Sequence, residues 1–298
     1  MNNEDLESLA YRIGNINNAQ FNNVYPILEA ELPALRLQFV HNSIAKSGTS
    51  LSLRKTPITA RINAASMKED DYCSEECLNF LIAMIKAKMN SVICGLTGSG
   101  KTELAKYLAG HINRWERIIT IEDTLELHLL TIYPNKDVVE LQVNNIVDYD
   151  GAIKSCMRMK PTWILLSEAR GYEVKELIKS ISTGARIITT IHTGDARDIP
   201  KRLLNMFEDN ELSNDKVETM IYDYIDVGIH IQCDYTEGST HRYIDQLVVF
   251  YTDENNNKCR DLIYEVKNGE IIYKPIPKYV LNKFQKENIP PFKWGCDE

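Results

Sequence analysis

The sequence predicts an α/β fold, in which helices cover both faces of a parallel sheet. From about residue 73 onward, short apolar strands alternate with helical segments, and such strands are typical of a buried parallel sheet. These strands are expected at residues 91–94, 117–121, 163–166 and 186–191. After residue 226 the pattern changes to hairpin-like alternation, which indicates an antiparallel extension at the edge of the sheet.

The first 70 residues form a predicted small α+β domain. Apolar residues spaced for one helical face run through residues 4–18, and strand-like runs follow at 24–28, 35–41 and 51–55. Residues 64–71 are polar and are expected to be a linker. Because a unit of this size can barely hold a core of its own, we expect it to lean on a partner surface.

The second domain is predicted to span residues 71–298. Apolar residues spaced for one face predict helices at 78–89, 151–159, 172–182 and 195–207. Strands of the antiparallel extension are expected at 227–231, 243–252, 262–266 and 271–273. Polar turns at 253–257 and 268–269 separate the later strands. The Pro-rich tail from Lys274 gives no clear pattern.

Composition excludes several classes of protein. The net charge of −8 argues against a general nucleic-acid scaffold, because phosphate backbones need clustered Lys and Arg. Apolar runs stay well below the roughly 18 residues that cross a bilayer, and the polar, acidic N-terminus does not resemble a signal peptide. The 7 cysteines are scattered, and only Cys73 and Cys77 are close. We therefore expect reduced, mostly buried thiols in a cytoplasmic protein.

The octapeptide at residues 95–102 fits the phosphate-loop pattern G-x-x-x-x-G-K-[ST] at every fixed position, between an apolar strand and a helix former. Glycines let the backbone aim its N–H groups at phosphate oxygens, and the helix N-terminus adds partial positive charge. Lys101, on an exposed loop, would reach the β- and γ-phosphates, and the Thr102 hydroxyl would bind Mg²⁺. The residues predicted to hold the nucleotide are Gly95, Thr97, Gly98, Ser99, Gly100, Lys101 and Thr102. A glycine turn without a ligand is the alternative, which the flanking strand and helix disfavour.

Three carboxylates follow the strand at 117–121, namely those of Glu122, Asp123 and Glu126. The carboxyl ends of parallel strands form the ligand edge of such a sheet, so these side chains are expected to face the phosphates. The alternative is a solvated acidic loop.

Two further strands end in polar residues of the same kind. Glu168 follows the apolar run 163–166, as in a Walker B strand, where a carboxylate holds Mg²⁺ through water or orients the attacking water. His192 follows the strand at 186–191, where an imidazole can sense the γ-phosphate through a hydrogen bond. A histidine that caps the following helix is the alternative for His192.

These four elements, in this order and spacing, resemble the ATPases of type II and type IV secretion, type IV pilus assembly and conjugation. The resemblance covers roughly residues 6–266 and is most specific over 95–202. The segment from Glu122 to Glu126 resembles the family's Asp box, Glu168-Ala169-Arg170-Gly171 its Walker B ending, and the segment from Thr189 to His192 its His box. The absence of a paired C-x-x-C zinc insertion favours the branch of conjugative, type IV secretion and tight-adherence pilus ATPases.

The sequence also departs from the family pattern. Pro161-Thr162 stands where the family usually has Pro-Asp, and Ser167 replaces the usual glycine before the Walker B glutamate. The loop before the His box is shortened. The N-terminal domain is short for this family, which indicates a truncated or simplified domain.

The resemblance implies a RecA-like motor domain, a smaller N-terminal domain and a homo-hexamer that uses ATP and Mg²⁺. Glu168 is the predicted activator of water, with Glu126 and Glu122 as alternatives, and His192 completes the site. Predicted metal ligands are Thr102, Asp123 and Glu168. Because phosphoryl transfer needs added positive charge, arginines acting from a neighbouring subunit are expected. The candidates are Arg54, Arg61 and Arg158. Each of them could instead be an ordinary surface or ion-paired arginine. For Arg170 and Arg197 the interpretation is a structural role.

The predicted function is a Mg²⁺-dependent ATPase that powers assembly of, or transport through, a secretion, conjugation or pilus machine. Its partners would be inner-membrane components of that machine, and its location cytoplasmic and peripheral to the cytoplasmic membrane. Two alternatives stay open: a nucleotide-binding module that does not hydrolyse ATP, and a RecA-like nucleic-acid motor. The acidic balance disfavours the motor, and no stable nucleic-acid binding is expected.

Overall fold

The structure, a computed structural model, describes residues 2–32, 34–207, 212–236 and 238–295. The chain divides into two compact units, Met1–Thr59 and Ala60–Glu298. This division falls before the expected boundary at residue 70. The expected linker is not irregular, because Asn63 caps a short helix, α2 (Ala64–Glu69), through bonds from the backbone N–H groups of Ala65 and Ser66.

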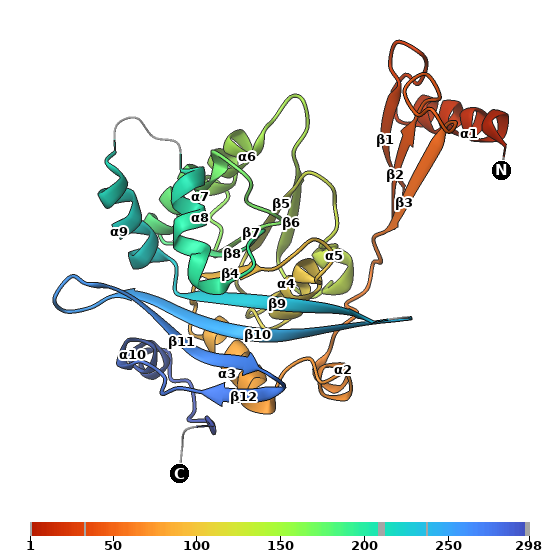
Figure 1. The fold of residues 1–298 in the computed structure, drawn as a ribbon. Coiled ribbons are helices and arrows are strands. Elements are labelled where there is room, and N and C mark those ends of the chain that lie inside the picture. The colour runs from red at the N-terminus through yellow and green to blue at the C-terminus, as the bar shows by residue number, and fades with distance from the viewer. Residues whose placement is uncertain (1, 33, 208–211, 237, 296–298) are drawn as a thin grey trace. The chain divides into compact units, whose positions relative to one another are not determined.

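The first unit pairs one helix with a small antiparallel sheet (Figure 1). Its elements are α1 (Asn3–Ile16), β1 (Ile27–Leu32), β2 (Leu35–Val40) and β3 (Ser50–Lys55), with the strands in the order β1-β2-β3. The α+β prediction and the second and third predicted strands are therefore confirmed, whereas the first strand begins at Ile27 and not at residue 24. Apolar side chains between the helix and the sheet form a core of their own, made by Ala10, Ile13, Phe21, Leu28, Ala30, Leu37 and Phe39.

The second unit is built on a nine-stranded sheet in the order β12-β11-β10-β9-β4-β8-β7-β5-β6. The strands are β4 (Ser91–Cys94), β5 (Ile118–Glu122), β6 (Val138–Gln142), β7 (Trp163–Leu166), β8 (Arg186–Ile191), β9 (Val227–Thr236), β10 (Ser239–Thr252), β11 (Lys258–Lys267) and β12 (Glu270–Tyr273). Pairings from β6 through to β9 are parallel, and those from β9 to β12 are antiparallel. The predicted parallel sheet with an antiparallel edge is confirmed.

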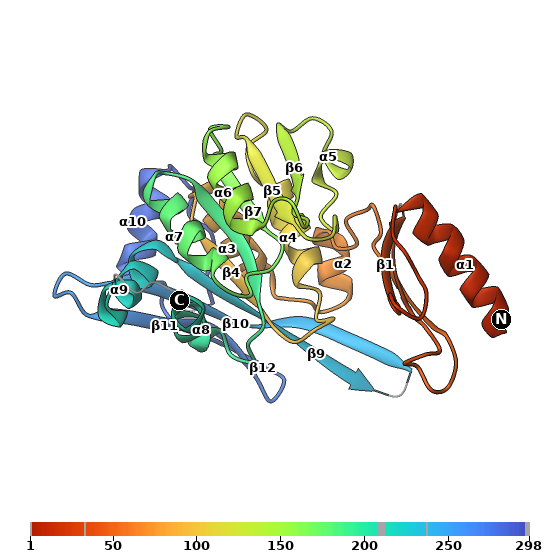
Figure 2. The same cartoon turned by 90° about the horizontal axis from the view of Figure 1, so that it is seen from above.

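Helices cover both faces of this sheet (Figures 1 and 2). They are α3 (Glu75–Lys86), α4 (Lys101–Gly110), α5 (Leu129–Ile132), α6 (Tyr149–Met157), α7 (Glu173–Ser182), α8 (Ile199–Met206), α9 (Asn214–Tyr224) and α10 (Lys278–Lys286), with a short 3₁₀ turn, η1 (Ala196–Asp198). One core contains residues of α3, α4, α5 and α10, and the other contains residues of α6 to α9. The strands between these two cores, such as β4 and β7, are buried along their whole length.

Several elements differ from the sequence expectations. β6 was not expected, because an edge strand whose residues are mostly half-buried lacks a continuous apolar run. α9 and α10 were also missed, since only a few residues of each are buried. β9 runs on to Thr236 instead of ending at Ile231, so the β9–β10 hairpin extends past the end of β4 (Figure 2). In the described part of the chain, we find no helix with the length and apolar character needed to cross a bilayer.

Candidate nucleotide-binding site

The loop between β4 and α4 has backbone angles that require glycine. Gly95, Gly98 and Gly100 have φ angles of 148°, 81° and 97°, which side-chain-bearing residues rarely adopt. A Cβ atom at Gly95 would also lie 2.6 Å from the carbonyl oxygen of Ile231. The sequence at these positions is therefore dictated by the loop conformation, as expected for a phosphate-binding loop.

The N-terminus of α4 opens onto this loop. Gly100 is the N-cap residue, and it supplies no side chain to cap the helix. The first N–H groups of a helix have no partner within the helix, and together with the helix dipole they attract anions. Thr102 lies in the first turn and is half-buried, whereas Thr97 and Gly98 are exposed and Ser99 is buried.

The Lys101 side chain is buried, with 8% of its surface exposed, and does not project from an exposed loop as expected. Its Nζ donates to the carbonyl oxygens of Gly95 and Leu96, each at 3.0 Å, and lies 3.2 Å from Nδ1 of His192. The ammonium group is therefore held inside the loop, on the side of the loop where β8 ends. Phosphate oxygens would be alternative acceptors for the same N–H groups.

His192 links the lysine to the predicted catalytic carboxylate. Its Nε2 lies 2.8 Å from Oε1 of Glu168. A lysine ammonium only donates and an ionised carboxylate only accepts, so the tautomer that satisfies both neighbours accepts at Nδ1 and donates from Nε2–H. The structure thus brings together the ends of β4, β7 and β8, and His192 is a link within the site and not merely a helix cap.

Arg170 extends this chain of contacts to the acidic loop after β5. One of its terminal nitrogens lies 2.7 Å from Oε2 of Glu168, and the other lies 3.0 Å from Oδ2 of Asp123. We call Lys101, His192, Glu168, Arg170 and Asp123 the five-residue network. It joins residues from four neighbouring strand ends in one line of alternating donors and acceptors.

Glu122 has a different place from its neighbour Asp123. Its side chain is fully buried, and its Oε2 accepts hydrogen bonds from the backbone N–H groups of Glu126 and Leu127 at 2.9 and 3.0 Å. Burial raises the pKa of Glu122 from 4.5 to about 7, although the two backbone bonds oppose this shift. The carboxylate holds the loop that follows β5. Glu126, the other predicted alternative, is half-buried on that loop.

The three predicted arginines lie in different parts of the chain. Arg54 is exposed on β3 of the first unit, opposite Arg36 on β2. Arg61 belongs to the second unit, and its backbone N–H donates to Oε2 of Glu103, the residue after Thr102, at 3.0 Å. Arg158 ends α6 and is exposed.

The direction of the chain places Arg158 away from the phosphate loop. α6 leads into the amino end of β7, so Arg158 lies toward the edge of the sheet opposite the carboxyl ends of the parallel strands. An arginine at that edge could act only on the site of another subunit.

The donor set at this edge suits Mg²⁺. Thr102 offers a hydroxyl, and Asp123 and Glu168 offer carboxylates, all oxygen ligands that a hard divalent cation prefers. Both carboxylates are engaged by Arg170, with 31% and 18% of their side-chain surfaces exposed. Contact with the ion through water therefore fits Glu168 better than direct coordination does.

Sequence reasoning missed one side chain at the loop. Nε of Arg242, on β10, donates to the carbonyl oxygen of Gly98 at 3.0 Å. No motif marks this residue, and only an extension of the predicted strands past Ile231 could have placed it near the loop. Arg170, which we considered as a structural arginine, lies between two of the predicted site residues.

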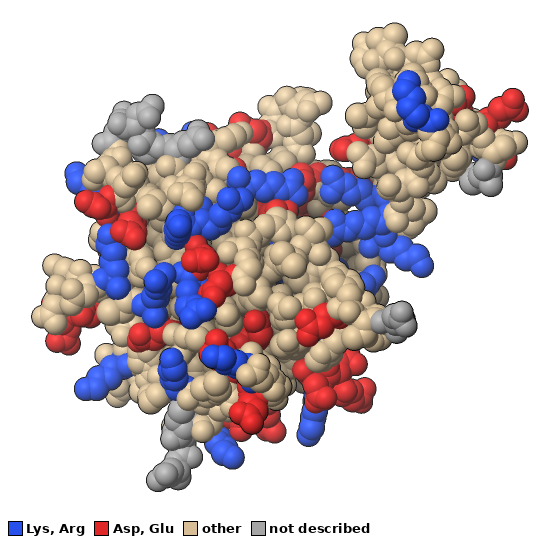
Figure 3. Space-filling model, in the orientation of Figure 1, with Lys and Arg blue, Asp and Glu red and all other residues tan. Residues whose placement is uncertain are grey.

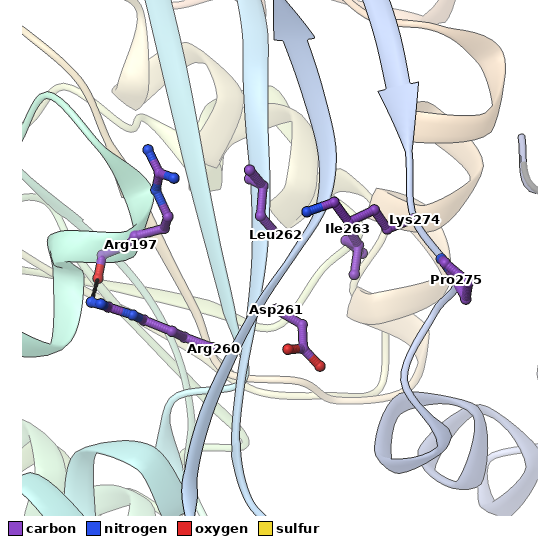
Figure 4. A pocket seen from close by; sticks show the side chains of 7 residues that line it. All are labelled: Arg197, Arg260, Asp261, Leu262, Ile263, Lys274 and Pro275. Carbon is purple, nitrogen blue, oxygen red and sulfur yellow. Dashed lines mark hydrogen bonds between the residues drawn. The ribbon is translucent and has the colours of Figure 1, made fainter.

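A separate cavity of about 310 Å³ lies at the antiparallel edge of the sheet (Figure 4). Its lining includes none of the predicted nucleotide-binding residues and consists of Arg197, Arg260, Asp261, Leu262, Ile263, Lys274 and Pro275. Two guanidinium groups of the lining already have partners. Arg197 forms an ion pair with Asp195, and Arg260 donates a hydrogen bond to the carbonyl oxygen of Arg197. In Figure 4 the cationic groups do not converge on one point.

On the face drawn in Figure 3, basic side chains gather in a band across the upper part of the second unit, with acidic side chains beside and below them. The chain as a whole is acidic, with a net charge of −8. Backbone binding to nucleic acid usually needs a clustered positive surface.

Comparisons with known proteins agree with this geometry. Residues 28–267 match the family model described as type II/IV secretion system protein. The type IV secretion system protein VirB11 of Brucella suis is 30% identical over 277 residues, which cover 81% of this chain and 75% of the relative. An uncharacterized protein of Bacillus anthracis is 29% identical over 228 residues, and the match covers 76% of this chain and 50% of that relative.

A solved structure matches as well. The crystal structure of the VirB11 ATPase of Brucella suis in complex with sulphate superposes with a TM-score of 0.53 at 26% identity. The match covers 84% of this chain and 81% of the other.

Proposed function

This chain belongs to the type II/IV secretion system protein family, and on that premise we propose that it is a Mg²⁺-dependent ATPase of a cell-envelope secretion, conjugation or pilus machine. The observation that supports this most is the five-residue network. It joins the phosphate-loop lysine to the histidine, the glutamate and the aspartate of three other motifs. Such convergence is what phosphoryl transfer to water needs, because its catalysis rests on positioning and charge.

Different residues bind the phosphates and activate the attacking water. Lys101 and the N–H groups of the loop hold the phosphates and stabilise the charge that shifts toward the leaving group. Glu168 accepts the proton of the attacking water, while His192 and Arg170 fix the orientation of its carboxylate.

Mg²⁺ would be held by Thr102 and, through water, by Glu168. When bound, it would neutralise charge on the β- and γ-phosphates. Asp123 lies at the same edge, bonded to Arg170, and would complete the acidic side of the metal site.

We also propose that the active form is a hexameric ring. Arg54, Arg61 and Arg158 are exposed, so each would be available to the site of a neighbouring subunit. An arginine added from outside would raise the positive charge around the phosphates only when the ring is closed. The ring would work in the cytoplasm at the inner face of the membrane, on inner-membrane components of the machine.

Phosphate release from ATP tests the proposal. The parent protein should release phosphate with Mg²⁺ and lose this activity with EDTA, and Lys101→Ala should abolish nucleotide-dependent turnover. Hydrolysis by Lys101→Ala at the parent rate would show that the loop is not the active site. Nucleotide binding by the parent without any phosphate release would favour the non-hydrolysing module instead.

A further inference from the structure

The β9–β10 hairpin lies beside the phosphate loop. β4 ends where Cys94 pairs with His230 of β9, whereas β9 continues to Thr236 and turns back as β10. Arg242 pairs directly with Cys233, so their side chains share one face of the hairpin, and Tyr235 lies on that same face. This is the face that contacts the loop.

Two contacts define this face. Nε of Arg242 donates to the Gly98 carbonyl at 3.0 Å, and its Cδ would lie 3.5 Å from a Cβ atom at Gly100. The hydroxyl of Tyr235 would lie 3.7 Å from a Cβ atom at Gly98. The hairpin therefore packs against the two glycines whose left-handed backbone makes the loop most adaptable.

The hairpin is itself held in place. His241, on the opposite face, lies with Nε2 at 3.0 Å from the carbonyl oxygen of Asp70, and its ring stacks on that of Tyr243. The N–H of Ile244 donates to the carbonyl oxygen of Tyr72 at 2.8 Å. Arg242 therefore extends from a strand that is anchored to the same unit, and its contact with the loop is well supported.

The Gly98 carbonyl matters because a peptide group is planar. When its oxygen points toward Arg242, the N–H of Ser99 must point to the other side, where it donates to the Leu96 carbonyl at 3.2 Å. The same carbonyl accepts from Nζ of Lys101, so a phosphate oxygen would replace it as the acceptor of both groups. A glycine backbone could turn this peptide around at little cost and present an oxygen where phosphates bind. A guanidinium hydrogen-bonded to the carbonyl disfavours that rotation.

We propose that Arg242 is a positioning residue of the nucleotide site, which fixes the Gly98–Ser99 peptide in the orientation that receives phosphate. This inference rests on the proposed function, because it assigns a role at the same site. The positive charge of Arg242 comes from the same chain as the loop, so Arg242 acts in the monomer as well as in a ring. Arg242 thus aids binding of the nucleotide and not the chemical step.

The test measures ATP and ADP affinity, kcat, KM and the melting temperature of the full chain. Arg242→Gln should weaken binding of ATP and ADP alike by about tenfold, as for loss of one charge-assisted hydrogen bond, and raise KM while kcat stays within about twofold. Arg242→Lys keeps a charged donor and should recover most of the affinity. Ser239→Ala, at an exposed position on the far face of the hairpin, is the control and should bind as the parent does.

Several results would overturn the inference. Parent-like affinity of Arg242→Gln would show that the hairpin plays no part in binding, and a fall in kcat at constant KM would show that Arg242 acts in the transition state. If Arg242→Gln melts early and Arg242→Lys binds no better, the role is structural. A parent that binds neither ATP nor ADP overturns the proposed function and this inference together, whereas normal binding by the parent and by Arg242→Gln overturns this inference alone.

Discussion

Glu122→Gln separates a structural carboxylate from a catalytic one. Glu122 is fully buried, and its pKa is raised by burial from 4.5 to about 7. A folded-state pKa above the unfolded value gives stability that is present below pH 4.5 and is lost as the pH rises to about 7. Each pKa unit of difference between the folded and unfolded states corresponds to 1.36 kcal/mol, so the loss of stability amounts to about 3 kcal/mol. Glutamine stays neutral, and its oxygen can still accept from the N–H groups of Glu126 and Leu127.

We therefore expect the unfolding free energies of the parent and of Glu122→Gln to diverge with pH. Denaturant unfolding at several pH values between 4.5 and 8 gives the difference between the two proteins at each pH, so that contributions from other groups cancel. The free energy of unfolding of the variant, minus that of the parent, should rise by about 3 kcal/mol from the low to the high end of this range. Glu265→Gln, on the distant strand β11, controls for the loss of one negative charge.

Phosphate release by the same variants completes the experiment. A carboxylate that only holds a loop predicts turnover within about threefold of the parent, whereas a water-activating group predicts a loss of about a hundredfold or more. Parallel stability curves for the parent and Glu122→Gln would refute the argument from burial. A hundredfold loss of turnover would return Glu122 to the catalytic residues.

Three further predictions address catalysis, assembly and packing. Glu168→Gln should bind ATP as the parent does but lose about a hundredfold or more in turnover, measured by phosphate release; comparable turnover would move the role to Glu126 or Glu122. Arg54→Ala should lower turnover far more than ATP affinity, and parent activity per subunit should rise with concentration; constant activity on dilution to monomer, followed by light scattering, would contradict this. Gly228→Ala should cost about 1–3 kcal/mol in thermal unfolding, because the new Cβ would lie 2.6 Å from Ile199 and 2.9 Å from Phe250; an unchanged melting temperature would show that these side chains make room.

The sequence predicted the part of the fold that follows from local patterns. Continuous apolar runs such as Trp163–Leu166 are recognisable because these strands are buried on both faces. β6 and α10 were missed because an edge strand and an outer helix bury only one side and so show weaker periodicity. The pattern at α2 predicts a linker instead of a helix, since its polar surface conceals one fully buried residue, Met67.

The site was predicted as motifs, but its connections were not. Spacing in the chain placed Lys101, Glu168 and His192 at one edge of the sheet, and in the structure His192 contacts both of the others there. That Arg170 would join two carboxylates depends on side-chain directions that no motif specifies. Glu122 is the last residue of β5, in which every residue is buried, whereas Asp123 lies beyond the end of the strand and is half-buried.

The five-residue network has a consequence for how substitutions combine. Each inner member depends on two neighbours, so removal of one link leaves the next side chain without the contact that fixes it. Losses from single substitutions that act on one shared partner will then overlap. His192 and Arg170 both contact Glu168, so a chain lacking both should lose less activity than the two single losses multiplied together. Sequence change at this edge is correspondingly constrained: a substitution at one member alters which residues are tolerated at the next, so members are expected to vary together or not at all.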